Sequence, residues 1–116
     1  MLDNRCKNII FETPFSIEIT FTGITRERSA EVAAEFLHGQ IERGSNCSVT
    51  VPSGRKWHFV YNESVIPLKK VQGSLIKASD DYRVEMLSPM FTHYVDVSSC
   101  NELLDMLKKA GAFFST

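Results

Sequence analysis

The stretch FSIEITFTGITRERSAEVAAEFL, residues 15–37, predicts a strand, a tight turn and a helix. In its first part apolar and polar residues alternate, a period of two that places the apolar set on one face of a sheet. Gly23 ends the predicted strand. Thr25 is the expected N-cap of the helix, with Glu27 in a first turn where an acid suits the helix dipole. Gly39 is the expected C-cap. The apolar stripe of this helix comprises Val32, Ala33, Phe36 and Leu37.

Length and composition predict one small domain spanning residues 1–116. The chain has 116 residues, of which 43% are hydrophobic, enough for one modest core. A net charge of -1 gives no global field that would drive it onto nucleic acid or acidic lipid. No apolar run is long enough to span a bilayer, and the polar start shows no signal peptide, so we expect a cytoplasmic protein.

The cysteines do not predict a disulfide framework or a zinc site. Their number is odd, their spacing is wide and no CxxC pattern occurs, so we expect reduced thiols. The histidines are scattered, and no metal ligand is assigned to them. These residues are Cys6, Cys47, Cys100, His38, His58 and His93.

Around this stretch, the first half of the chain predicts an arm and a hairpin. Residues 1–14 form an N-terminal arm whose apolar part could add an edge strand interrupted by Pro14. Residues 40–46 are a polar loop. Residues 48–51 and 56–61 flank a turn signal and predict two paired strands. Trp57, Phe59 and Tyr61 would share one face of the second of these strands, opposite His58 and Val60.

The second half predicts a long connection followed by another strand. Residues 62–74 have no clear period, and residues 75–78 are expected to pair back on them. Residues 82–87 alternate as a strand that places Glu85 on the face opposite Val84. Glu18 and Glu85 could then face the same side of the sheet.

A final helix should begin at a capping box formed by Ser99 and Glu102, and end at Gly111. Phe113 and Phe114 are the start of a further strand. The fold class expected is α+β: a mostly antiparallel twisted sheet of about five strands with two helices on one face.

Five short motifs, in order, resemble the amidoligase family of carboxylate–amine ligases, which have a glutamine-synthetase-like fold. The similarity covers residues 15–112. The motifs are Thr-Gly-Ile-Thr-Arg at 22–26, Gly-Arg-Lys-Trp at 54–57, the acidic strand at 80–85, Ser-Pro at 88–89 and Lys-Lys-Ala-Gly-Ala at 108–112.

The resemblance implies a site where clustered carboxylates hold magnesium against ATP phosphates, because hard divalent cations prefer oxygen ligands. Two expected acids are replaced, by Thr20 and Asn62, and the chain stops at Thr116, before the family's histidine-rich strand. This indicates a ligase half that has lost its chemistry and needs no cofactor. The residual ligase-like face is predicted to contain Glu18, Arg26, Asn62, Arg83 and Glu85.

A basic segment is the other candidate site. Between residues 55 and 77 the only acid is Glu63, and the bases are Arg55, Lys56, Lys69, Lys70 and Lys77. Clustered Lys and Arg on one face are the electrostatic footprint of nucleic-acid binding, whereas solvated lysines are the plainer interpretation.

Some small proteins that inhibit type II CRISPR nucleases are similar to the N-terminal part of this family, which occurs on plasmids and phages. The resemblance therefore favours a non-enzymatic anti-CRISPR protein from a mobile genetic element, with the effector nuclease or its guide RNA as partner. The alternative is the N-terminal part of an ATP-dependent amidoligase, with magnesium and ATP, completed by a C-terminal half. A third interpretation is an interaction module that forms a homodimer through the edge near Phe113.

Overall fold

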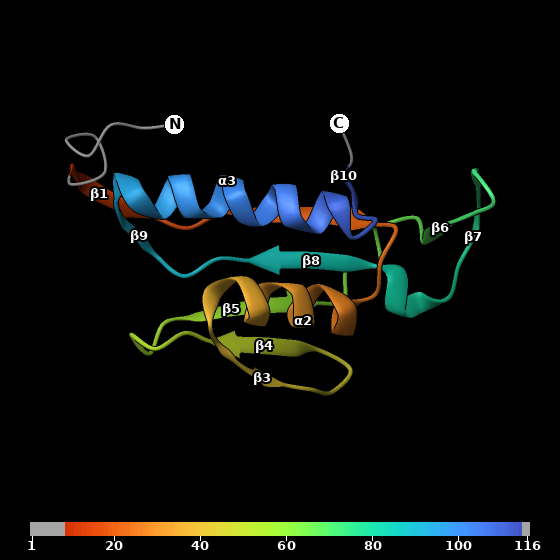
Figure 1. The fold of residues 1–116 in the computed structure, drawn as a ribbon, viewed down its shortest axis with the longest axis horizontal. Coiled ribbons are helices and arrows are strands. Elements are labelled where there is room, and N and C mark those ends of the chain that lie inside the picture. The colour runs from red at the N-terminus through yellow and green to blue at the C-terminus, as the bar shows by residue number, and fades with distance from the viewer. Residues whose placement is uncertain (1–8, 115–116) are drawn as a thin grey trace.

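The structure, a computed structural model, describes residues 9–114 and has the predicted α+β class (Figure 1). The predictions for Cys6 and for most of the N-terminal arm lie outside these residues. In chain order the elements are β1 (Ile10–Phe15), β2 (Glu18–Thr22), α2 (Arg26–Leu37), β3 (Gln40–Glu42), β4 (Cys47–Thr50), β5 (Lys56–Val60), β6 (Leu68–Val71), β7 (Ser74–Lys77), the 3₁₀ turn η1 (Asp80–Tyr82), β8 (Val84–Leu87), β9 (Phe91–His93), α3 (Tyr94–Lys109) and β10 (Phe113–Phe114).

The central sheet has six strands in the order β10-β2-β8-β5-β4-β3, and every neighbouring pair is antiparallel. β1 pairs with β9 in a separate two-stranded sheet, and β6 with β7 in a hairpin. The polar loop expected at residues 40–46 is wrong in its first part, because Gln40–Glu42 forms β3 and pairs with β4. The physical reason is Ile41, which stands opposite Val49 and packs against the core.

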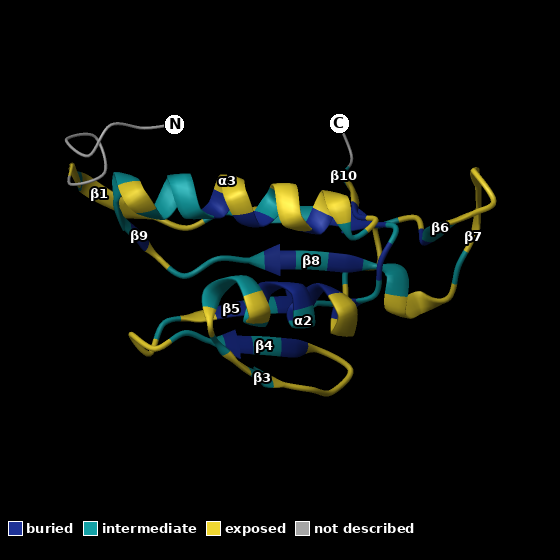
Figure 2. Ribbon diagram, in the orientation of Figure 1, coloured by how far each residue is buried: buried dark blue, intermediate teal, exposed yellow. Residues whose placement is uncertain are grey.

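Both helices cover one face of this sheet, as predicted. The core lies between them and the inward residues of the strands, which are coloured as buried in Figure 2. Alternation on β5 and β8 holds, since Trp57, Phe59, Val84 and Met86 are buried while the residues between them are only half-buried. From the helices, the fully buried side chains include Ala30, Ala33, Leu103 and Leu107.

Helix α2 begins where the sequence predicts and ends one residue earlier. The Thr25 side chain accepts a hydrogen bond from the backbone N–H of Arg28 at 3.0 Å, as an N-cap should. The C-cap is His38, with a left-handed φ of 56°, and not Gly39. Gly39 is needed for a different reason, because a Cβ there would lie 2.5 Å from a Val49 methyl.

Helix α3 begins at Tyr94, so the predicted start at Ser99 is wrong. Its capping box uses His93 as N-cap and Asp96 as N3, and the Asp96 carboxylate accepts from the backbone N–H groups of Thr92 and His93 at 2.8 and 3.0 Å. Ser99 lies inside the helix, where these two earlier residues have already capped the first turn.

Other strand predictions also differ in detail. β2 starts at Glu18, because Phe15 belongs to β1. β8 starts at Val84 because residues 80–82 turn as η1. β5 ends at Val60, which leaves Tyr61 exposed. Pro14 does not interrupt β1, which pairs with β9 on one side and has an irregular register, so the missing N–H is tolerated.

Candidate functional site

The sheet face opposite the helices carries the two glutamates that the sequence singles out. In the strand register Glu85 of β8 stands opposite Thr20 of β2, and Glu18 stands opposite Leu87. Side chains alternate along a strand, so these residues point away from the core. We call this helix-free side, marked by Glu18, Thr20, His58 and Glu85, the open face. Glu18 and Glu85 are diagonal neighbours on it, about 7–8 Å apart at the backbone and within reach of each other's side chains.

Thr20 and Asn62, which occupy the positions of expected acids, both adjoin Glu85. Thr20 is its cross-strand neighbour. Asn62 donates from Nδ2 to Glu85 Oε1 at 3.5 Å, and its Oδ1 accepts from the backbone N–H of Ser64 at 2.8 Å. An acid at either position would therefore stand beside Glu85, which is the arrangement that a carboxylate cluster requires.

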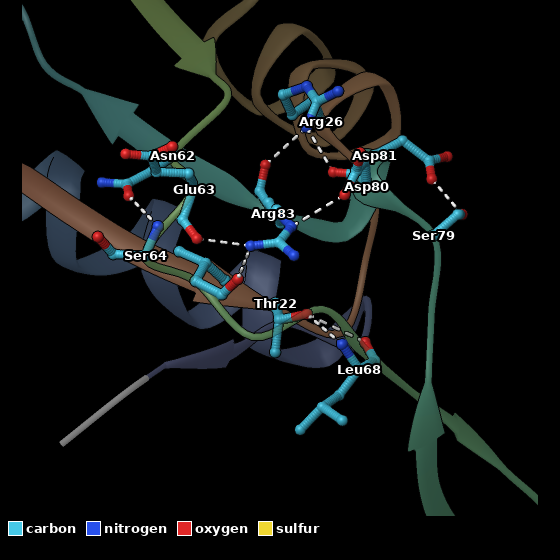
Figure 3. Close-up of polar contacts among 11 residues, drawn as sticks. Thr22, Arg26, Asn62, Glu63, Ser64, Leu68, Ser79, Asp80, Asp81 and Arg83 are labelled. Atoms are coloured by element: carbon cyan, nitrogen blue, oxygen red, sulfur yellow. Dashed lines mark hydrogen bonds and ion pairs between the residues drawn. The ribbon is translucent and has the colours of Figure 1, made fainter.

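A groove of about 470 Å³ adjoins the open face at the end of β2. One wall is the connection from β5 to β6, which includes Ile66, 72% exposed, and the opposite wall is β10. The connection is fixed at Leu68, whose backbone exchanges hydrogen bonds with the Thr22 hydroxyl at 2.8 and 3.1 Å (Figure 3). The groove is apolar apart from the hydroxyls of Thr20, Thr22 and Ser64.

Arg26 does not lie on the open face. Its guanidinium is buried and donates to three backbone carbonyls, those of Ser45 at 2.7 Å, Asp80 at 2.8 Å and Arg83 at 2.7 Å. Figure 3 shows the contacts with Asp80 and Arg83. It also lies 5.6 Å from the centre of the Tyr61 ring. These contacts give Arg26 a role in the fold.

Arg83 likewise has a structural role. Its Nε pairs with Asp80 at 3.0 Å, and its Nη1 donates to the carbonyls of Glu63 at 2.5 Å and Val65 at 2.8 Å. Arg83 thus holds the connection that forms one wall of the groove (Figure 3). Of the five residues predicted for the ligase-like face, the structure brings together Glu18, Asn62 and Glu85.

The predicted basic ridge is divided between two ends of the molecule. The turn before β5, with Arg55 and Lys56, lies at one end of the long axis, and the β6–β7 hairpin, with the other lysines, lies at the opposite end (Figure 1). Arg55 pairs with Asp96 at 3.1 Å and donates to the carbonyl of Met90 at 2.7 Å. Lys56 points to the open face, two residues before His58 on β5.

Asp96 is the one carboxyl with a clear electrostatic shift among residues 9–114. Burial alone would raise its pKa, but the backbone N–H groups of His93 and Thr92 and the guanidinium of Arg55 together lower the pKa below its ordinary value of 3.8. This carboxylate caps α3, so its charge serves the fold.

His58 is the open-face residue that the sequence interpretation left unassigned. In the register it flanks Leu87 on the side opposite Glu18. The signal that could have found it is the same period of two, applied jointly to β5 and β8. The described cysteines, Cys47 and Cys100, are free and buried, and burial raises the pKa of the Cys100 thiol to about 11.

The metal donors of the open face fit a shared magnesium site only in part. In the described part of the chain no three His, Cys, Asp or Glu side chains gather closely enough to enclose an ion. Magnesium, however, commonly takes one or two carboxylates and keeps water and substrate phosphates as its other ligands. Glu18 and Glu85 match that smaller contribution.

The sequence was compared with protein-family models, curated proteins and solved structures. A family model described as "Putative amidoligase enzyme" matches residues 12–116. No curated protein and no solved structure matches the chain. No helix among residues 9–114 has both the length and the apolar character needed to cross a membrane.

Proposed function

The chain belongs to the amidoligase family, and on that premise we propose that its open face forms one wall of an ATP-dependent ligase site. Such a site would join a carboxylate to an amine as an amide. The observation that carries the proposal is the diagonal placement of Glu18 and Glu85 on the helix-free face, beside the groove.

In this proposal Glu18 and Glu85 hold a magnesium ion, which neutralises phosphate charge when bound. Asn62 orients the Glu85 carboxylate through the Nδ2 contact. The hydroxyl of Thr20, beside Glu85, adds a polar group without charge. Two carboxylates leave ligand positions to be filled by water, phosphate oxygens or further protein.

The isolated chain is therefore expected to bind a divalent cation weakly and not to turn over ATP. The double variant Thr20→Glu, Asn62→Asp adds two carboxylates next to Glu85. It should bind Mg²⁺ at least about tenfold more tightly, because each added charge-assisted contact is commonly worth more than the 1.4 kcal/mol that corresponds to tenfold. It should still not hydrolyse ATP.

Paramagnetic Mn²⁺ can test the site directly. The amide signals of Glu18, Thr20 and Glu85 should broaden first in a titration, and Glu18→Gln with Glu85→Gln should abolish this. Glu35→Gln is the matched control, because Glu35 is an exposed glutamate of α2 on the helix-covered side. The proposal would be rejected if Mn²⁺ broadened signals away from the open face first, or if the broadening persisted in the Glu18→Gln, Glu85→Gln variant.

We also propose a second, non-enzymatic function, inhibition of a type II CRISPR effector nuclease. It is supported by Thr20 and Asn62 at the positions of expected acids, and by the lysines of residues 9–114, which form no ion pair there. Adding the chain before guide RNA is loaded should block target cleavage. Charge reversal of Lys56 should be tested separately from reversal of Lys69 and Lys70, since the two sites lie apart. Full cleavage at a large excess of the chain, with several nucleases, would exclude this function.

A further inference from the structure

The arginines and lysines of residues 9–114 are used differently. Every arginine there donates to a carboxylate or a backbone carbonyl, whereas no lysine there forms an ion pair. Three of the unpaired lysines, Lys69, Lys70 and Lys108, line one cleft of about 420 Å³. No carboxylate of residues 9–114 lines it. The cleft lies between the β6–β7 hairpin and the end of α3, and of the described residues it shares only Phe113 with the open-face groove.

The walls of this cleft are fixed to one another. The backbone N–H of Gly23 donates to the Leu68 carbonyl at 3.0 Å, which anchors the hairpin to the end of β2 directly before Lys69. On the other wall, Gly23 is pressed against the turn after α3, since a Cβ on Gly23 would lie 2.2 Å from the Gly111 carbonyl oxygen. Lys69 and Lys108 thus project from two segments that meet at Gly23, which reduces the entropy lost when a ligand bridges them.

Two acids directly precede Tyr82 of the cleft in the chain. Asp80 pairs with Arg83 at 3.0 Å, and Asp81 accepts a hydrogen bond from the Ser79 hydroxyl. Neither lines the cleft, whose described lining carries three lysine charges and no acid. Its rim also offers apolar surface from Leu75, 43% exposed, and the half-buried ring of Tyr82.

From this we propose that the cleft binds the phosphates of a small polyphosphorylated ligand of nucleotide size. Lysine ammonium groups bind phosphate oxygens as point charges, and a volume of about 420 Å³ falls in the range of small-molecule sites. A concave site of this size favours a mononucleotide or a short polyphosphate over a nucleic-acid backbone. This site is separate from the magnesium-binding face proposed above.

The test is a titration of the 116-residue chain with inorganic pyrophosphate, inorganic triphosphate and ADP, without divalent metal. Amide signals of Gly23, Lys69 and Gly111 should shift, while those of Glu18 and Glu85 on the open face should not. Omitting the metal keeps a failure here distinct from a failure of the ligase proposal. Tighter binding of ADP than of pyrophosphate would indicate that the apolar rim contacts the nucleotide base. Equal binding would assign the cleft to the phosphates alone, and both results support the site.

Matched variants isolate the charge. The triple variant K69Q, K70Q, K108Q should weaken triphosphate binding at least about tenfold. The control triple K56Q, K77Q, K109Q has the same net charge but lies outside the cleft, and it should change binding less than about twofold. Should the first triple not fold, K108Q compared with K109Q makes the same test.

Three results would overturn the proposal. They are equal weakening by the two triples, shifts confined to the open face, and binding of single-stranded RNA under conditions where triphosphate does not bind.

Discussion

The two faces of the central sheet are made by alternate residues of the same strands, yet one face is packed under the helices and the other is not. On β5 and β8, Phe59 and Met86 are fully buried beneath the helices, while their neighbours Val60 and Glu85 are half-buried on the open face. The covered face contains the apolar contacts that hold the fold together. The open face contains polar and charged groups that no helix covers. Their replacement should therefore disturb the packing less than replacement of a core residue.

The largest expected effect compares adjacent residues of β5. Phe59→Ala should lower the free energy of unfolding by about 3–5 kcal/mol, because it leaves a cavity in a close-packed core. Val60→Ala should cost less than about 1 kcal/mol on the open face. Urea denaturation measures both. Equal losses would mean that the open face is covered in solution and that the contrast between the faces is false.

Arg26 gives the next largest effect. Arg26→Met keeps the aliphatic stem but removes the donor to the carbonyls of Ser45 and Arg83, and it leaves the Asp80 carbonyl with the Arg83 N–H alone, so we expect a loss of about 2–4 kcal/mol. Arg28→Met is the control, because Arg28 forms only an exposed pair with Glu31 and should cost less than about 0.5 kcal/mol. If Arg26→Met changed the free energy of unfolding little but abolished ligand binding, Arg26 would belong to the functional site after all.

The contribution of Asp96 to the stability of the helix-covered side should depend on pH. Its pKa in the folded state lies below the ordinary value of 3.8, so the carboxylate stabilises the fold above that value and the stabilisation is lost as pH falls through the folded pKa. At pH 7, Asp96→Asn should be less stable by about 1–2 kcal/mol. The difference should shrink in acid, below about pH 3.8.

The control for this titration is Asp105→Asn, an exposed aspartate of the same helix. It should be nearly neutral at every pH in thermal or urea unfolding. A deficit for Asp96→Asn that persists unchanged in acid would show that the charge of Asp96 is not what stabilises the start of α3.

The smallest expected change in stability concerns β10. Phe114 packs on Phe21, with ring centroids 5.2 Å apart, whereas Phe113 is 50% exposed at the sheet edge. A homodimer through this edge stays a prediction. Light scattering over a concentration series should show association that Phe113→Ser weakens, with a change in unfolding free energy below about 1 kcal/mol. A monomer at all concentrations would contradict the dimer.

The elements that the sequence predicts well are those with a local signal. Strict alternation defines β2, β5 and β8, and the Thr25 cap defines the start of α2. That same alternation brings Glu18 and Glu85 to one face. β3 is missed because three residues give too short a pattern, and the start of α3 is missed because its N-cap is a histidine, an uncommon choice.

The roles of Arg26 and Arg83 could not be predicted in this way. The acceptors of Arg26 lie 19, 54 and 57 residues away along the chain, so no pattern near Arg26 encodes them. The division of the basic segment has the same origin, since the connection between β5 and β6 carries its lysines to the far end of the molecule.

The position of β8 has a consequence for how the chain folds. β8 pairs with β2 on one side and with β5 on the other, so these earlier strands become neighbours of the same strand only when residues 84–87 enter between them. During synthesis β3, β4 and β5 can form a local antiparallel meander, while the edges of β2 and β5 stay open. Completing the sheet requires contacts between distant segments, which slows folding and exposes strand edges to other chains meanwhile. β2 and β5 can therefore join one sheet only after residues 84–87 have paired with both.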